Sequence, residues 1–201
     1  MFSKHIRKKV VEYKEAFSSR YFVLSLVLSI VLFAMSLLIS VSATSYATRS
    51  ASGPVTDLIL SNTDVYPLDG IFVNGAMLLV LFIFFICLWW PKRAPFTIKA
   101  IVLFILVRSL FITLTHIGTF PTHEVINPSS QNILQAIFGV KLYSSFFLGN
   151  DSFFSGHTGL PFLMSLIYWD RKYLRVFFIC CSIGFGIVVL LAHLHYTIDV
   201  L

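Results

Sequence analysis

Two short polar clusters near the C-terminal end of the chain carry the residue types that phosphoryl chemistry requires. The first, Gly149–Thr158 (GNDSFFSGHT), holds Ser155, Gly156, His157 and Thr158 directly before an apolar run. A helix N-terminus presents unpaired backbone N–H groups and a partial positive charge, which suit a phosphate oxygen. Ser155 is a fitting N-cap, and Gly156 lets the backbone approach a ligand closely. We therefore expect Ser155, Gly156 and Thr158 to bind phosphate and His157 to donate a proton to a leaving oxygen. The alternative is a capped helix whose histidine only sits at a membrane interface.

The second cluster, His193–Asp199 (HLHYTID), suggests a nucleophile and its partner. His195 and Asp199 are four residues apart, so on a helix they share one face. The carboxylate can then hold one ring nitrogen as N–H and leave the other free to attack phosphorus. The alternative is a capping aspartate beside an interfacial histidine.

A zinc centre is the competing chemistry for the histidines at 116, 123, 193 and 195. Two histidines at i, i+2 do not share a helix face, and the sequence contains no HExxH pattern. We therefore expect no metal and no cofactor.

The composition excludes a soluble globular protein, a disordered tail and a basic nucleic-acid module. Of the 201 residues, 57% are hydrophobic and only 12% charged, against about 25% charged in a typical soluble domain. With 21 Phe and a mean hydropathy of +0.86, the chain cannot cover its surface with polar groups. The three cysteines lie inside apolar runs, so no disulfide framework is expected. This is the pattern of an integral membrane protein without a nucleic-acid partner.

Apolar runs of about 20 residues predict an all-α, polytopic membrane bundle. Five spans can be counted, and a sixth that would start near His195 is truncated or absent. The fragment 1–20 is predicted as a basic cytoplasmic N-terminus and 21–201 as one transmembrane catalytic domain, with its motifs in 98–201. The five predicted spans are Tyr21–Val41, Ile71–Trp90, Ile98–Ile117, Phe153–Trp169 and Tyr173–Ala192.

The positions of Lys and Arg predict the orientation of these spans. If the spans alternate, twelve of the fifteen basic residues fall on one side, which is then the cytoplasmic side. The polar loops Ser42–Gly70 and Gly118–Ser152, and both histidine clusters, then fall on the exoplasmic side. The half-apolar segment Gln131–Leu148 is predicted to lie at the interface.

Arg108 is the eleventh residue of its apolar run, close to mid-depth, with Thr115, His116 and Thr119 further along. A charge at that depth costs about 2.5–3.5 kcal/mol on insertion scales, so an intramembrane Arg indicates a functional site. Its guanidinium can bind phosphate in a bidentate manner. The alternatives are a place at the floor of the site, or a role limited to pairing with a carboxylate.

Three motifs in order resemble the sphingomyelin synthase family, a branch of the lipid phosphate phosphatase superfamily. They are Phe154–Thr158 (FSGHT), His195–Val200 (HYTIDV) and Arg108–Thr115 (RSLFITLT) with Pro121 shortly after, and the resemblance covers about Ile98–Leu201. It implies a six-helix membrane core and a metal-independent reaction through a phosphohistidine-like intermediate. By position, His195 would be the nucleophile, Asp199 its orienting partner and His157 the acid/base.

The resemblance also implies the partners, which are a phospholipid donor and ceramide or a diacylglycerol-like lipid, on the exoplasmic face. Hydrolytic relatives hand the phosphoryl group to water, so a lipid phosphate phosphatase using the same residues is the first alternative. A catalytically silent, lipid-binding membrane protein is the second. The headgroup, the acceptor and the oligomeric state stay open.

Overall fold

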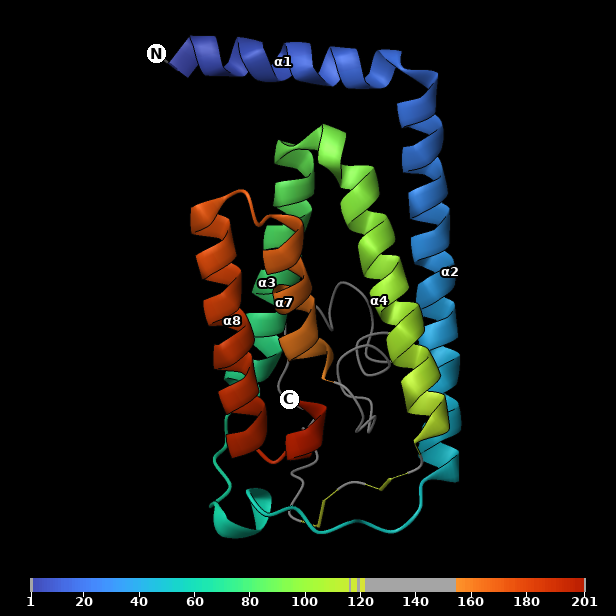
Figure 1. The fold of residues 1–201 in the computed structure, drawn as a ribbon, viewed down its shortest axis with the longest axis vertical. Coiled ribbons are helices and arrows are strands. Elements are labelled where there is room, and N and C mark those ends of the chain that lie inside the picture. The colour runs from blue at the N-terminus through green and yellow to red at the C-terminus, as the bar shows by residue number, and fades with distance from the viewer. Residues whose placement is uncertain (1, 116, 119, 122–154, 201) are drawn as a thin grey trace.

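The computed structural model describes residues 2–115, 117–118, 120–121 and 155–200, and in this part of the chain it contains helices and no strand (Figure 1). The α-helices are α1 (Phe2–Ser18), α2 (Arg20–Ser50), α3 (Asp69–Trp89), α4 (Ala94–Leu114), α7 (Gly156–Ile167) and α8 (Lys172–Leu191). Three 3-10 turns accompany them: η1 (Leu60–Asn62), η2 (Pro91–Arg93) and η3 (Thr197–Asp199). The all-α prediction is confirmed.

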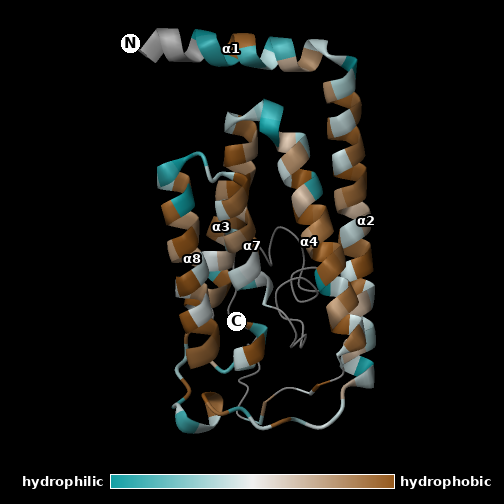
Figure 2. Ribbon diagram, viewed as in Figure 1, coloured by the Kyte–Doolittle hydropathy of each residue, from teal (hydrophilic) through white to brown (hydrophobic). Residues whose placement is uncertain are grey.

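Four helices are long and apolar enough to cross a membrane, namely the stretches Arg20–Ser50, Gly70–Trp89, Pro91–Leu114 and Lys172–Leu191. Hydrophobic residues cover most of their length (Figure 2). These stretches confirm four of the five predicted spans and the assignment as an integral membrane protein. The fifth, Phe153–Trp169, holds the 12-residue helix α7, about 18 Å long at 1.5 Å per residue. That length is short of a hydrocarbon core of about 30 Å.

The basic N-terminus forms the helix α1, which runs crosswise to α2 over one end of the bundle (Figure 1). Its inner face is held by the ends of the spans. Lys9 Nζ donates to the Trp89 carbonyl at 2.5 Å, and the Tyr13 hydroxyl donates to the Leu88 carbonyl. Val10 and Phe17 are exposed apolar residues on the same helix, as in a helix that lies along a membrane surface.

The basic loops gather at this same end of the bundle. Lys92 Nζ binds Glu15 of α1 at 2.8 Å. Arg93 binds both carboxylate oxygens of Asp170, at 2.7 and 2.8 Å, and so ties the start of α4 to the turn between α7 and α8. The hydrogen-bonded guanidinium of Arg93 holds the pKa of the Asp170 carboxyl below its usual value.

Two apolar clusters hold α3, α7 and α8 together, while α2 lies along α4 (Figure 1). The cluster nearer α1 is built from Leu79, Ile83, Ile86, Met164, Tyr168 and Phe178. The cluster at the far end is built from Phe72, Val73, Val189, Ala192 and Leu194. The far cluster includes residues that follow α8, so the C-terminal turn is packed into the bundle.

Candidate active site

The first turn of α7 is fixed by the C-terminal turn of the chain. The Ser155 N–H donates to the Asp199 carbonyl at 2.8 Å, so the two motif clusters are joined directly through their backbones. Ser155 stands at the predicted N-cap position, but its hydroxyl makes no capping hydrogen bond. The Ser155 Oγ is fully buried and has no hydrogen-bond partner among the described residues. A buried hydroxyl without a partner is costly, so Ser155 Oγ is a candidate contact for a polar ligand.

Arg108 reaches from α4 to this same turn. A Cβ built on Gly156 would lie 3.4 Å from Arg108 Nε and 3.8 Å from Cζ. Because Gly156 has no side chain, it leaves space beside the Arg108 guanidinium. The structure therefore brings Arg108, from the middle of a span, against the helix N-terminus that the sequence indicates as a phosphate site.

His157 lies in the same turn, partly buried between aromatic rings. Its ring is 3.9 Å from the Phe72 ring and 6.0 Å from the Phe185 ring, between centroids. His157 is also close enough to His195 and Arg108 to interact with them electrostatically. The three charged or titratable side chains that the sequence places far apart therefore meet in one region.

His195 and Asp199 are neighbours, but the predicted α-helix between them is wrong. The distance from His195 Nδ1 to Asp199 Oδ2 is 3.6 Å, and only 7% and 2% of the two side chains are exposed. The carboxylate also accepts a hydrogen bond from the Tyr196 N–H at 2.9 Å. The segment is a bend followed by the 3-10 turn η3.

The reason lies in the way α8 ends. The Leu194 N–H donates to the Val189 carbonyl and the His193 N–H to the Leu190 carbonyl, the paired bonds of a Schellman motif. His193 has a φ of 52°, the left-handed conformation that this motif requires. Leu194 and Val189 pack in the same apolar cluster, which completes the motif. The chain therefore turns back at His193, and a sixth helix does not begin at His195.

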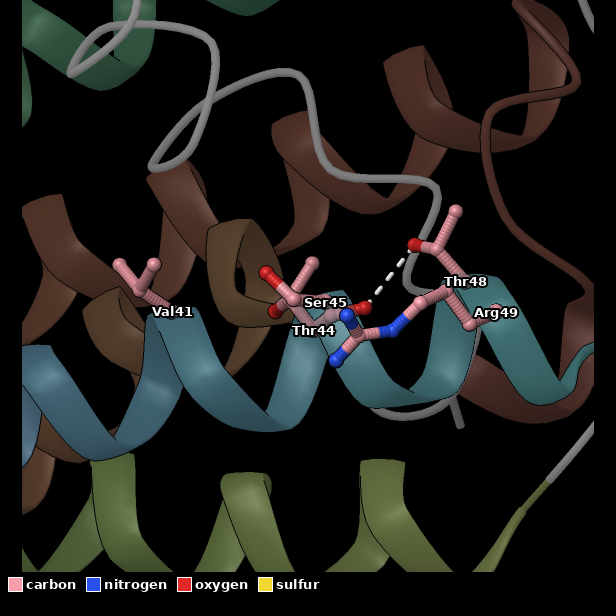
Figure 3. A pocket seen from close by; sticks show the side chains of 5 residues that line it. All are labelled: Val41, Thr44, Ser45, Thr48 and Arg49. Atoms are coloured by element: carbon pink, nitrogen blue, oxygen red, sulfur yellow. Dashed lines mark hydrogen bonds between the residues drawn. The ribbon is translucent and has the colours of Figure 1, made fainter.

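A separate recess of about 300 Å³ lies on α2 near its C-terminal end. Val41, Thr44, Ser45, Thr48 and Arg49 line it (Figure 3). The Thr48 hydroxyl donates to the Thr44 carbonyl of its own helix at 2.9 Å. None of these five residues belongs to the two histidine clusters.

Residues 149–201 match a family model described as PAP2 superfamily C-terminal. This match supports the PAP2 (type 2 phosphatidic acid phosphatase) superfamily and a function of the lipid phosphatase or phosphotransferase type. It spans both histidine clusters, and Arg108 lies outside it. The chain matches no curated protein and no solved structure.

The remaining residues singled out from the sequence make other contacts or lie outside the described residues. The Thr158 hydroxyl donates to the Ser155 carbonyl at 3.1 Å, and the Thr115 hydroxyl to the Phe111 carbonyl at 2.8 Å. His193 Nε2 is 3.2 Å from Thr63 Oγ1. Among the described residues no three His, Cys, Asp or Glu side chains gather as metal ligands. His116, Thr119, His123, the segment 131–148 and residues 149–154 lie outside the described residues.

Sequence reasoning missed the loop between α2 and α3. Residues 51–68 pack against the C-terminal turn, with Asp57 hydrogen-bonded to Thr197. The sequence shows this loop only as a polar stretch, and Asp57 is 140 residues from its partner. No local pattern connects the two.

Proposed function

We propose that this protein is a membrane-embedded phosphotransferase of the sphingomyelin synthase type, which moves a phosphoryl headgroup from a phospholipid to ceramide or a similar lipid alcohol. The observation that carries the proposal is the convergence of Arg108, the first turn of α7 and the His195–Asp199 pair. A helix N-terminus and a guanidinium side by side suit a phosphate group. The buried, unpartnered Ser155 hydroxyl supports the same place for the ligand.

In this proposal His195 is the nucleophile. Asp199, beside Nδ1, keeps the proton there, so the lone pair of Nε2 attacks phosphorus. The new P–N bond forms as the P–O bond to the donor's diacylglycerol breaks, and His157 gives its proton to the leaving oxygen. His157 then takes the proton of the acceptor hydroxyl, whose oxygen attacks phosphorus and releases His195. Arg108, Gly156 and the α7 N–H groups stabilise the phosphoryl oxygens, with Thr158 shaping their turn.

Transfer to a lipid alcohol requires that water be kept from the intermediate. The packing of the His157 ring on Phe72, with Phe185 nearby, supports this choice over hydrolysis. Aromatic rings on one side of the acid/base leave little room for water there. This apolar wall is where the chain of an acceptor lipid would lie.

The reaction is proposed to take place on the exoplasmic side of the membrane. The basic residues of α1 and of the turns before α4 and α8 lie at the opposite end of the bundle. Lys and Arg in short loops favour the cytoplasm. Orientation can be tested in sealed vesicles with a tag after residue 1 and a protease site inserted in the loop 51–68. We expect the tag and the protease site to be accessible from opposite sides of the membrane.

The test uses the full chain in liposomes with a fluorescent ceramide and a mixture of phospholipids. A headgroup-bearing ceramide is expected from the wild type and is expected to be absent with His195→Ala and His157→Ala. His5→Ala, in α1, is the control and should leave the product unchanged. If free phosphate is released from a lipid phosphate and ceramide stays unchanged, the reaction is hydrolysis and not transfer. Identical lipid products from the wild type and both histidine variants would refute catalysis by these residues.

A further inference from the structure

The loop between α2 and α3, residues 51–68, is hydrogen-bonded to the turn that carries His195, and we call this set of contacts the clasp. Hydrogen bonds join the two segments at several points along their length. The Val55 N–H donates to the Tyr196 hydroxyl at 3.3 Å, the Tyr66 N–H donates to the Leu191 carbonyl at 3.0 Å, and Thr63 Oγ1 lies 3.2 Å from His193 Nε2.

Asp57 is the charged centre of this clasp. Its Oδ2 accepts the Thr197 N–H at 2.7 Å, and its Oδ1 accepts the Thr197 hydroxyl at 2.8 Å. Oδ1 also accepts the N–H groups of Ile59 and Leu60, at 2.9 and 3.1 Å. One carboxylate thus fixes the start of η1 in its own loop and the start of η3 in the C-terminal turn.

Two carboxylates hold two consecutive peptide N–H groups directly after His195. Asp199 takes that of Tyr196, and Asp57 takes that of Thr197. The same Asp199 carboxylate lies 3.6 Å from His195 Nδ1. A shift of the Thr197 backbone would therefore move Asp199 relative to the His195 ring.

Asp57 keeps its charge over the physiological range. Partial burial raises the pKa of its carboxyl, but the hydrogen bonds from Thr197, Leu60 and Ile59 outweigh burial and leave the pKa below its usual value. Hydrogen bonds to a charged group are stronger than those between neutral groups. The bond to the Thr197 N–H is of this kind.

We propose that Asp57 is a positioning residue of the reaction site, which sets the place of His195 and Asp199 by holding Thr197 and does not itself touch the substrate. The loop 51–68 is then part of the working enzyme. This inference rests on the proposed function for its kinetic consequence, while its structural half stands on hydrogen bonds that can be measured without any substrate.

The variant Asp57→Asn removes the charge at nearly constant shape. With the amide oxygen in the place of Oδ1, the NH2 group faces the Thr197 N–H, so that donor loses its acceptor. Asp64→Asn, an exposed position in the same loop, is the matched control. Hydrogen exchange of the peptide covering 194–199 in the full chain should rise at least about tenfold with Asp57→Asn and stay unchanged with Asp64→Asn. Equal hydrogen exchange of this peptide in the wild type, Asp57→Asn and Asp64→Asn would refute the clasp.

The kinetic arm measures kcat and KM for lipid transfer in the same liposomes. We expect Asp57→Asn to lower kcat about tenfold with KM within twofold, because the nucleophile moves while the lipid contacts stay. Faster exchange with an unchanged kcat would overturn the positioning role. An inactive wild type would refute the proposed function instead, and the clasp would then be judged by exchange alone.

A second variant keeps the test decisive if Asp57→Asn does not fold. Thr197→Ala removes the hydroxyl bond to Oδ1 and keeps the N–H bond to Oδ2. It should raise exchange of the same peptide at least about threefold but less than Asp57→Asn does, because one of the two bonds from Thr197 to the charged carboxylate remains. Thr197→Ser, which keeps the hydroxyl, should restore the wild-type exchange rate. No change with Thr197→Ala would count against the clasp.

Discussion

Gly186 lies where α8 passes closest to both halves of the candidate site. A Cβ built on it would be 3.1 Å from Val200 Cγ1 and 3.5 Å from Thr158 Cγ2. Carbon atoms prefer about 3.5–4.0 Å, so Gly186→Ala must push the Val200 side chain outward by a few tenths of an ångström. Val200 directly follows Asp199, and Thr158 directly follows His157. One added methyl group therefore presses on the motif that holds His195 and Asp199, and makes ordinary contact with the motif that holds His157.

The magnitude follows from comparison with Gly184→Ala on the same helix. Among the described residues, no atom lies within 4 Å of a Cβ built on Gly184. Both substitutions gain about 0.5–1 kcal/mol from the lower backbone entropy of alanine in a helix. Only Gly186→Ala has the overpacking cost of about 1–3 kcal/mol. Because the helix gain cancels, the two variants should differ in unfolding free energy by about 1–3 kcal/mol, with Gly184→Ala the more stable.

The assay is SDS titration of each purified variant in mixed micelles, followed by far-UV circular dichroism, with lipid transfer measured on the same samples. Gly186→Ala should unfold at lower SDS than Gly184→Ala and should transfer more slowly, since Asp199 moves with Val200. Gly184→Ala should keep wild-type transfer. If the two variants are equally stable and equally active, the close packing of α8 against the C-terminal turn is not as described.

Three other expectations follow from single contacts. Gly75→Ala, whose Cβ would lie 3.1 Å from two atoms of the Phe185 ring, should slow lipid transfer by shifting that ring, and unchanged transfer would contradict this. Asp170→Asn breaks an exposed ion pair with Arg93, so SDS titration should show only a small loss of stability, which high salt reduces further. A loss as large as that expected for Gly186→Ala would mean that the pair acts as a buried one. Folding lowers the pKa of Asp57, so its contribution to the stability of the fold is present above the unfolded pKa of about 3.9 and is lost as pH falls through the lower folded pKa. Hydrogen exchange of the peptide 194–199, corrected for its intrinsic pH dependence, should therefore stay constant from pH 8 to 5. A rise in exchange within that window would contradict a lowered pKa for Asp57.

The spanning helices could be predicted closely because hydrophobic length alone determines them. The predicted span Ile71–Trp90 is α3, Asp69–Trp89, and the predicted span Tyr173–Ala192 lies within two residues of α8 at both ends. The first helix runs on to Ser50, past the predicted Val41, because Ser, Thr and Ala continue the helical backbone where hydropathy falls. The N-terminal helix α1 was not predicted, since its basic residues indicate a cytoplasmic flank and not its conformation.

The proximity of the two histidine motifs could be predicted from the sequence, but not the local geometry of the candidate site. The spacing of His195 and Asp199 correctly indicated two neighbouring side chains. The helix inferred from that spacing was wrong, because the left-handed His193 ends α8 and a residue other than glycine in that conformation leaves no signal in the sequence. The approach of Arg108 to Gly156 is a contact between separate helices, and only the assembled bundle decides it.

The short helix α7 explains why this site needs so many tertiary hydrogen bonds. Its C-terminal end is tied through Asp170 to Arg93 at the basic end of the bundle. From there, 12 residues reach about 18 Å, less than a hydrocarbon core of about 30 Å. The buried backbone polar groups around its N-terminus must find partners within the protein. The Ser155 N–H finds the Asp199 carbonyl, the Tyr196 N–H finds the Asp199 carboxylate and the Thr197 N–H finds Asp57. In the proposed function, a phosphate oxygen would bind the buried Ser155 hydroxyl, which has no partner among the described residues.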